Sequence, residues 1–261
     1  MGTIISILNF KGGVGKTTTS INLGAALAMG GYKVLIIDVD GQRNATSILR
    51  YGKTDEEVKE ESSQTIFEFL TGETYELFCY DTAIENLALV PSSEDMRNIE
   101  IKLNARKNRE HILGKFARQM REHFDYVLID CPPGKGVIID NAMTASDHIV
   151  IPITCEMLSL EGMADLMREV QEVKEELNDK LNILGLLATM YDGRIKMHRQ
   201  LYEALRDNFP GKVFDTRIRR NTSLGEFLGN APSIFQYAPE SNGAADYQSF
   251  ANEFVQKLKE A

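Results

Sequence analysis

Short apolar runs alternate along the chain with segments of helical periodicity. The runs have strand length, are rich in β-branched residues and cover residues 3–8, 33–38, 87–90, 126–130, 148–153 and 182–190. The helical segments include residues 17–29, 99–123, 159–177, 197–208 and 246–259. Nearly continuous apolar strands are typical of strands buried on both faces. The pattern therefore predicts one α/β domain over residues 1–261, with a mostly parallel, twisted sheet and helices on both faces.

One stretch departs from this alternation. Residues 53–63 read KTDEEVKEESS and are almost entirely polar. A segment with so few apolar positions has little to bury, so we expect a solvated excursion or a mobile loop.

Composition sets the broad class of the protein. The chain has 261 residues, of which 43% are hydrophobic and 26% charged, as in ordinary globular proteins. No apolar run approaches the length of a membrane helix, which predicts a cytoplasmic protein without a membrane partner. Three cysteines lack metal-ligand spacing and are expected to be reduced thiols in the core.

Charge is unevenly distributed. The formal net charge is -9, which excludes a surface that is basic all over. Residues 194–220 nevertheless hold eight Lys or Arg against three acids, so this segment is +5 and the remainder of the chain is -14. A basic patch on an acidic protein follows.

A glycine-rich loop lies between the first predicted strand and the first predicted helix. Residues 9–18 read NFKGGVGKTT, close to the phosphate-loop pattern G-x-x-x-x-G-K-[ST], although Phe10 stands where the first glycine belongs and a second lysine, Lys11, follows it. Backbone amides of the loop and the helix N-terminus suit phosphate oxygens, Lys16 the β and γ phosphates, and Thr17 a Mg²⁺ ion. The loop residues predicted to bind nucleotide are Lys11, Gly12, Gly13, Val14, Gly15, Lys16, Thr17 and Thr18.

Three aspartates follow predicted strands. Asp130 ends YVLIID, while Asp38 and Asp40 belong to IIDVDGQRNAT. Carboxyl ends of parallel strands meet at one edge of a sheet, so these carboxylates should converge on the phosphate loop. Asp130 and Asp38, with Thr17, are the predicted metal-site residues.

Together these motifs carry a resemblance. The segments KGGVGKTT, DVDGQRNAT, IDCPPG, LSLEGMADL and ATMYDGR occur in the order seen in ParA-type partition ATPases, within the wider ParA/MinD group that has a deviant Walker A loop. The resemblance extends from Ile4 to about Phe254. It implies a P-loop NTPase fold that binds ATP and Mg²⁺.

The resemblance also implies roles for individual residues. Lys11 would reach across a homodimer to the nucleotide of the other subunit, and Asp40 would position the attacking water, so Lys11, Lys16 and Asp40 are the predicted catalytic residues. Two highly charged nucleotides facing each other would repel unless cations lay between them, which agrees with a shared Lys11.

Several positions depart from the family pattern. The family usually has Asp-Pro-Gln-Gly where this chain has Gly41 and Arg43 around Gln42, and Arg219 replaces a proline in the segment RIRRN. By the same match, Asn221 would lie near the adenine, and Met190 and Asp192 would line the base pocket. Arg220 aligns with an arginine that contacts DNA.

The implied function is a partition cycle. ATP closes a dimer, the dimer binds non-specific double-stranded DNA of the nucleoid, and a ParB-type centromere-binding protein stimulates slow hydrolysis and release. Contacts to phosphate need cations but no sequence reading, which the basic segment supplies. The residues predicted to bind DNA are Arg194, Arg217, Arg219 and Arg220.

Three alternatives remain at this stage. A MinD-like membrane ATPase would need an amphipathic C-terminal anchor, for which Phe250, Phe254 and Leu258 have helical spacing. An iron protein of the nitrogenase type would need cluster ligands, of which Cys131 is the one candidate. A nucleotide-gated adaptor would bind ATP without turnover.

Overall fold

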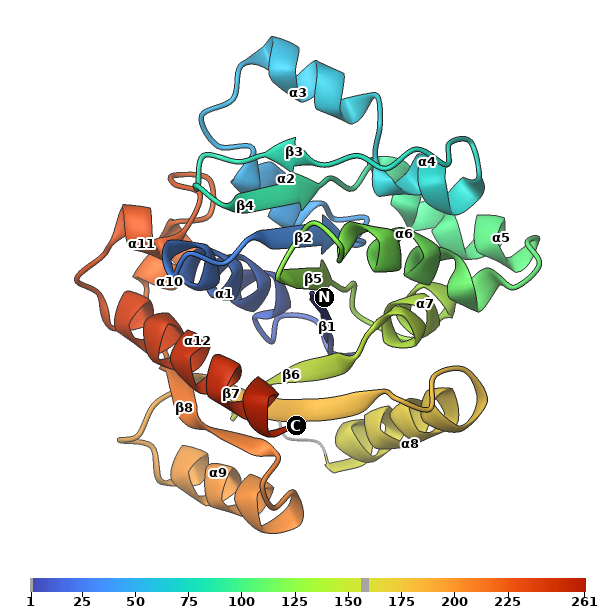
Figure 1. Cartoon of the computed structure of the whole chain (residues 1–261). Helices are drawn as coiled ribbons and strands as arrows, with labels where there is room; N and C mark the ends of the chain where they lie inside the picture. The colour runs from blue at the N-terminus through green and yellow to red at the C-terminus, as the bar shows by residue number, and fades with distance from the viewer. Residues whose placement is uncertain (1, 156–159) are drawn as a thin grey trace.

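Eight strands form one sheet in the part of the chain that the structure, a computed structural model, describes, residues 2–155 and 160–261 (Figure 1). The strands are β1 (Thr3–Ile7), β2 (Val34–Asp38), β3 (Tyr80–Asp81), β4 (Leu87–Val90), β5 (Tyr126–Asp130), β6 (His148–Thr154), β7 (Asn182–Tyr191) and β8 (Val213–Arg219). Their spatial order is β3-β4-β2-β5-β1-β6-β7-β8. All neighbouring strands are parallel except β3 and β4, which confirms the predicted sheet.

The order of the strands places the chemistry at one edge. β1 lies between β5 and β6, and β5 also pairs with β2, so that Asp38 and Asp130 are register partners. Ile7 of β1 pairs with Asp130 on the other side. The phosphate loop after β1 and both aspartates therefore emerge side by side at the carboxyl edge.

Helices cover both faces of the sheet (Figure 1). They are α1 (Lys16–Met29), α2 (Asn44–Leu49), α3 (Asp55–Ser62), α4 (Ile66–Thr71), α5 (Ile99–Asn104), α6 (Ile112–Met120), α7 (Val137–Ala145), α8 (Leu160–Glu176), α9 (Lys196–Asn208), α10 (Ser223–Glu226), α11 (Ile234–Tyr237) and α12 (Asn242–Glu260), with 3₁₀ turns η1 (Glu94–Asn98) and η2 (Arg109–His111). Two separate apolar cores result. One core holds α1 and α12, whereas the other holds α4, α6, α7 and α8.

The structure corrects several elements predicted from the pattern. Residues 99–123 are not one helix, because α5 ends at Asn104 and the chain passes through η2 before α6. Residues 53–63 are largely exposed as expected but helical. There Thr54 and Glu57 cap α3 reciprocally, since the Thr54 hydroxyl accepts from the Glu57 N–H and the Glu57 carboxylate accepts from the Thr54 N–H.

Other differences lie at the ends of elements. The predicted helix 159–177 begins outside the described residues and is helical from Leu160. Strand β8 was missed because its buried Val213, Phe214 and Ile218 are interrupted by polar residues, as suits the edge of a sheet. Of the cysteines, Cys131 and Cys155 are buried, but Cys79 is exposed. No helix in the described ranges is long and apolar enough to span a bilayer.

Candidate nucleotide site

The loop between β1 and α1 adopts a conformation that its glycines permit. Gly13 and Gly15 have φ of 73° and 84°, in the left-handed region that side chains disfavour. Gly15 is also the N-cap of α1, so the free amides of the first helical turn point toward the loop. This is a concave array of donors suited to an anion.

Lys16 lies inside the loop. Its ammonium donates hydrogen bonds to the carbonyls of Asn9 and Lys11, at 3.1 and 2.9 Å, and the residue is buried. Burial lowers the pKa of Lys16, and nearby Asp130 opposes that effect. A desolvated ammonium held at the loop centre attracts phosphate oxygens more strongly than a hydrated one.

Two hydroxyls from α1 hold Asp130. Thr17 Oγ1 donates to one carboxylate oxygen and Ser20 Oγ to the other, both at 2.8 Å. Asp130 is completely buried, so it lies behind Thr17 rather than on the cavity surface. Sequence reasoning missed Ser20, although its position one helical turn after Lys16 places it on the same side of α1.

Asp38 is buried in the same way. Its carboxylate accepts from the Asp40 N–H at 3.0 Å and from the N–H and hydroxyl of Thr46 at 2.8 and 2.7 Å. Burial raises the pKa of both Asp38 and Asp130, and their mutual repulsion raises that of Asp130 further. These two buried carboxylates concentrate negative charge beside Lys16 and Thr17, and a Mg²⁺ ion bound at Thr17 would offset it.

Asp40 alone of the three aspartates faces the cavity. Its Oδ1 accepts from the Gln42 N–H at 2.8 Å, and its carbonyl accepts from the Ser92 hydroxyl at 2.8 Å. Ser92 is in turn tied to Thr46, whose hydroxyl accepts from the Ser92 N–H. Within the described ranges Oδ2 of Asp40 has no hydrogen-bond partner, which leaves one oxygen to hold a water molecule.

These residues surround one cavity of about 570 Å³, within the usual size range of small-molecule sites. Its lining comprises Gly12, Gly13, Gly15, Lys16, Thr17, Thr18, Asp40, Gln42, Asn44, Ser47, Ile48, Pro133, Met190, Leu228 and Gly229. The Thr17 hydroxyl is a ligand that fits Mg²⁺, which usually takes few protein ligands and keeps waters and phosphate oxygens. Within the described chain, no cluster of three or more His, Cys, Asp or Glu offers a metal cage.

Of the three residues predicted to form the base pocket, one lines the cavity and two do not. Met190 lines the cavity and has φ of 51°, a strained conformation for a side chain. Asp192 and Asn221 are absent from the lining. Asp192 is paired with Arg194, and the Asn221 side chain accepts from the Ser223 N–H at 2.9 Å. Leu228 and Gly229 line the cavity instead, without any signal in the sequence.

The residues that depart from the family pattern make specific contacts with neighbouring segments. The Phe10 carbonyl accepts from the Gly134 N–H at 2.8 Å, and the Lys135 ammonium lies 5.1 Å from the Phe10 ring centroid. A Cβ at Gly41 would come within 2.9 Å of the Arg97 nitrogen of η1. Arg43, at φ of 58°, forms an ion pair with Glu94 of the same turn.

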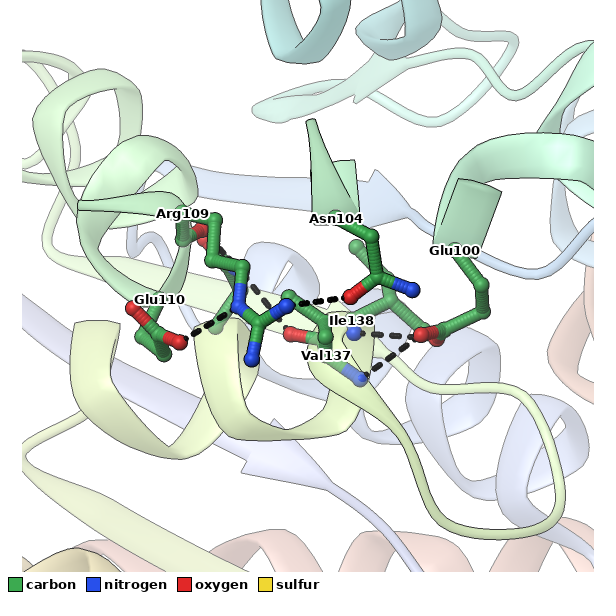
Figure 2. A network of polar contacts seen from close by, with 7 residues as sticks. Glu100, Asn104, Arg109, Glu110, Val137 and Ile138 are labelled. Atoms are coloured by element: carbon green, nitrogen blue, oxygen red, sulfur yellow. Dashed lines mark hydrogen bonds and ion pairs between the residues drawn. The ribbon is translucent and has the colours of Figure 1, made fainter. Parts of the chain in front are cut away.

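A carboxylate fixes the far end of the loop after β5. Glu100 of α5 accepts from the N–H groups of Val137 and Ile138, at 2.8 and 3.1 Å, and so caps α7 from another element (Figure 2). Gly136 has φ of 144°, which side chains rarely adopt, and a Cβ there would also displace the Glu100 carboxylate, 2.6 Å away. Beside it, the Arg109 guanidinium donates hydrogen bonds to the side chains of Glu110 and Asn104 (Figure 2).

The four arginines predicted to bind DNA differ in their surroundings. Arg217 stacks between the rings of Tyr191 and Tyr202, with centroid distances of 5.0 and 4.9 Å. Arg219 makes an ion pair with Asp246 of α12, and Arg194 makes one with Asp192. Arg220 is exposed and follows β8 directly.

Two alternatives lose support from the packing. Phe250 and Phe254 of α12 are fully buried against β8 and α1, so the apolar stripe of this helix covers the core rather than a membrane. Cys131 is likewise fully buried, and its thiol lies 3.7 Å from the Ile129 carbonyl. It is not at a surface where a second subunit could share a cluster.

Known proteins resemble this chain over nearly its whole length. A family model described as an AAA domain matches residues 2–183. The sporulation initiation inhibitor protein Soj of Bacillus subtilis is 41% identical over 254 residues, covering 97% of this chain and 98% of Soj. The chromosome partitioning protein ParA of Caulobacter vibrioides is 36% identical over 260 residues, covering 98% and 95%.

A solved structure shares the fold. Cobyrinic acid a,c-diamide synthase from Mycobacterium smegmatis, with a bound ATP analogue and magnesium, has a TM-score of 0.83 and 30% identity. The match covers 99% of this chain and 96% of that one. An ATP analogue and magnesium therefore occur together in a protein of this architecture.

Proposed function

Because the chain belongs to the ParA/Soj family of chromosome-partitioning ATPases, we propose that ATP closes it into a homodimer that carries non-specific DNA until a ParB-type partner stimulates hydrolysis. The protein is a DNA-partitioning ATPase that converts ATP and water to ADP and phosphate and uses Mg²⁺. The observation that carries the mechanism is that Lys16, Thr17 and Asp40 line one cavity at the N-terminus of α1.

Phosphate binding is the first step. The amides of the loop and of the first turn of α1 receive the phosphate oxygens, and the Lys16 ammonium exchanges its loop carbonyls for them. Mg²⁺, when bound, would neutralise phosphate charge. The Thr17 hydroxyl would be its protein ligand, and Asp130 orients this hydroxyl, as Asp38 does that of Thr46.

Water positioning is the second step. The Gln42 N–H holds Oδ1 of Asp40, and Oδ2 would be left to hold the attacking water. The Ser92 hydroxyl fixes the backbone carbonyl of Asp40, and Ser92 is itself tied to Thr46. Phosphoryl transfer depends chiefly on placement and charge, so a carboxylate fixed in this way orients the nucleophile rather than acting as a strong base. In a single protomer, Lys16 alone would compensate the negative charge of the γ-phosphate incompletely, so turnover would be slow.

Lys11 supplies the missing cation from the other subunit. Its carbonyl holds Lys16, but its side chain is not part of the lining of its own cavity. A lysine at the rim of one site is therefore available to the facing site, where it offsets the repulsion between the two nucleotides. ATP favours the dimer over ADP, because its additional phosphate offers Lys11 of the other subunit an anion to bind.

DNA binding follows from dimerisation. Two basic patches joined rigidly bind a polyanion far more tightly than one, so dimerisation raises the affinity for DNA. Arg217, held between two tyrosine rings, is the leading contact, and Arg220 is exposed directly after β8. Arg194 and Arg219 contribute less than Arg217, because carboxylates pair with them. Retention on the nucleoid and release by the partner follow from making and breaking the dimer.

One experiment tests the proposal. ATP turnover is measured with and without DNA, and the mass of the complex is measured with Lys11 intact and with Lys11→Ala. We expect DNA-stimulated phosphate release and an ATP-dependent dimer that Lys11→Ala abolishes. A nucleotide-gated adaptor would bind ATP without release, and a Lys11→Ala protein that still dimerises would contradict the role of Lys11.

A further inference from the structure

A second basic cavity lies at the opposite edge of the sheet from the nucleotide. It has a volume of about 560 Å³. Four lysines from four segments line it, and together they are named the lysine pocket: Lys174 of α8, Lys180 before β7, Lys212 before β8 and Lys257 of α12. The one acidic side chain in the lining is Glu260.

The charge of the lysine pocket is poorly compensated. Within the described residues, none of its four lysines makes an ion pair. Lys212 instead donates to the Asn182 side chain and the Ile183 carbonyl, at 3.0 and 2.8 Å, and Lys257 to the Gly211 carbonyl at 3.1 Å. Burial and the charges of Lys257 and Lys174 lower the pKa of Lys212. His148 in the same lining has a buried Nδ1 without a hydrogen-bond partner.

Strand β8 connects the lysine pocket to the arginines of the proposed DNA face. Lys212 precedes the strand and Arg217, Arg219 and Arg220 stand at its other end. Seven residues of strand span about 20 Å, or roughly six base pairs of B-form DNA. Beside Arg217, Arg199 and Arg206 of α9 line a cavity that also holds Glu203 and Asp207, and Arg206 pairs with Asp215, so the surplus of cations lies at the two ends of β8.

We propose that the lysine pocket is a second contact for DNA backbone phosphates, at the other end of β8 from Arg217. The inference rests on the proposed function, because it needs a protein that binds DNA. A compact anion would need cations at one end of β8 only, whereas cations at both ends of the edge strand suit a long polyanion. The protein, although acidic overall, would therefore contact one DNA duplex at two places, the lysine pocket and the arginines at the other end of β8.

The test uses the two lysines whose removal leaves the fold intact. Lys174 and Lys180 are exposed and make no hydrogen bond in the described part of the chain, unlike Lys212 and Lys257. Affinity of the full-length, ATP-bound protein for short duplexes of unrelated sequence is measured across salt concentrations for wild type, for Lys174→Ala with Lys180→Ala, and for a control. The control, Lys102→Ala with Lys107→Ala, removes equal charge from exposed positions at and beyond α5.

We expect the pocket variant to bind roughly tenfold more weakly, and its logarithmic salt slope to fall by about two, while the control matches wild type. ATP turnover without DNA should be unchanged in both. Protection of Lys174 and Lys180 from acetylation by bound DNA is the direct readout. Equal affinity, slope and protection in pocket variant and control would overturn the inference.

The outcomes separate the two proposals. If wild type binds DNA and Arg217→Ala weakens it while the pocket variant does not, the lysine pocket is not a DNA contact and the proposed function stands. If wild type shows no DNA binding at any salt concentration, the proposed function fails first. If tripolyphosphate binds the pocket and DNA does not protect it, the site belongs to a compact anion and the inference is wrong.

Discussion

The nucleotide edge and the basic edge of this molecule are built in opposite ways. At the nucleotide edge, Asp38 and Asp130 are fully buried and held by hydroxyls, so their geometry is fixed before any ligand arrives. At the basic edge, Arg194 is 91% exposed at its side chain, and the other cations stand on a single edge strand or on α9. Chemistry needs fixed placement, whereas contact with phosphates needs charge alone.

The pairing of charges differs as well. The two buried carboxylates repel each other and have Lys16 as a nearby cation, so a further cation brought by the ligand would relieve the repulsion. The arginines already have partners, namely Asp192, Asp246 and the two tyrosine rings. Ligand binding therefore stabilises the nucleotide edge strongly, whereas DNA binding at the basic edge replaces existing partners of the arginines with phosphates.

Removing the water-positioning carboxylate should give the largest effect. Asp40→Ala is expected to keep ATP binding and dimerisation and to lower turnover at least about 100-fold, because placement of the nucleophile is lost. Gln42→Ala, which keeps the carboxylate and the Gln42 N–H that holds it, is the control. Phosphate release and nucleotide binding are measured together, and normal hydrolysis in Asp40→Ala would remove Asp40 from the mechanism.

Neutralising the buried pair tests the dependence on ligand. Asp130→Asn keeps an acceptor oxygen for one of the two hydroxyls of Thr17 and Ser20, while the other hydroxyl can turn to accept from the new amide. The substitution removes a buried acid that Asp38 repels, so the nucleotide-free protein should gain about 1 to 2 kcal/mol of unfolding free energy at neutral pH. The shift in Tm on adding Mg²⁺ and ATP should shrink. An unchanged nucleotide-free Tm would contradict the buried repulsion.

The same pair sets a pH dependence. Its folded-state pKa values lie above the ordinary value of 3.8, so the folded protein binds protons more tightly than the unfolded chain. The free energy of unfolding without nucleotide should therefore fall as pH rises above that value. In Asp130→Asn the decline should be shallower, which denaturant titrations at several pH values would measure.

The basic edge can be divided by comparing two arginines of one strand. Arg217→Ala should weaken DNA binding roughly tenfold and lower the salt slope by about one, whereas Arg219→Ala should change it little because Asp246 already pairs with Arg219. Arg219→Ala should instead cost about 1 kcal/mol of stability, because Asp246 loses its guanidinium partner and keeps only the backbone N–H of residue 219. Equal losses of DNA affinity would show that the ion pair opens on binding.

The smallest effect concerns Arg43, which stands where relatives of this type usually have glycine. Arg43→Gly relieves a positive φ and loses an exposed ion pair, for a net gain of about 0.5 kcal/mol. Glu94→Gln removes the ion pair and keeps the strained backbone, so it should be neutral or slightly destabilising. Thermal unfolding of both separates the two contributions, and a destabilised Arg43→Gly would mean that the pair dominates.

Sequence reasoning reached the parts of this molecule that local patterns encode. Nearly continuous apolar runs located the inner strands, and the loop glycines located the phosphate site. It could not find Leu228 or Gly229 of the cavity, since only tertiary packing brings the segment after α10 to the loop. Nor could it find Thr46 and Ser92, because a hydroxyl that fixes a carboxylate has no spacing rule.

Charge counting was the weakest guide. It found the basic segment but not that Asp246, far along the chain, pairs with Arg219. It also could not join Lys174 to Lys257, because α8 and α12 are brought together by the sheet. Long-range pairings of this kind depend on topology, which local propensity does not encode.

The order of the strands also governs when the site appears during synthesis. β1 carries the phosphate loop and leaves the ribosome first, yet its hydrogen-bonded neighbours are β5 and β6, which are translated much later. The loop therefore lacks the neighbouring strands of its sheet until about half of the chain has been made. The helix α12, which packs on α1, is translated later still. A nascent chain of this protein cannot capture ATP early, so nucleotide can select only protomers that are already nearly complete.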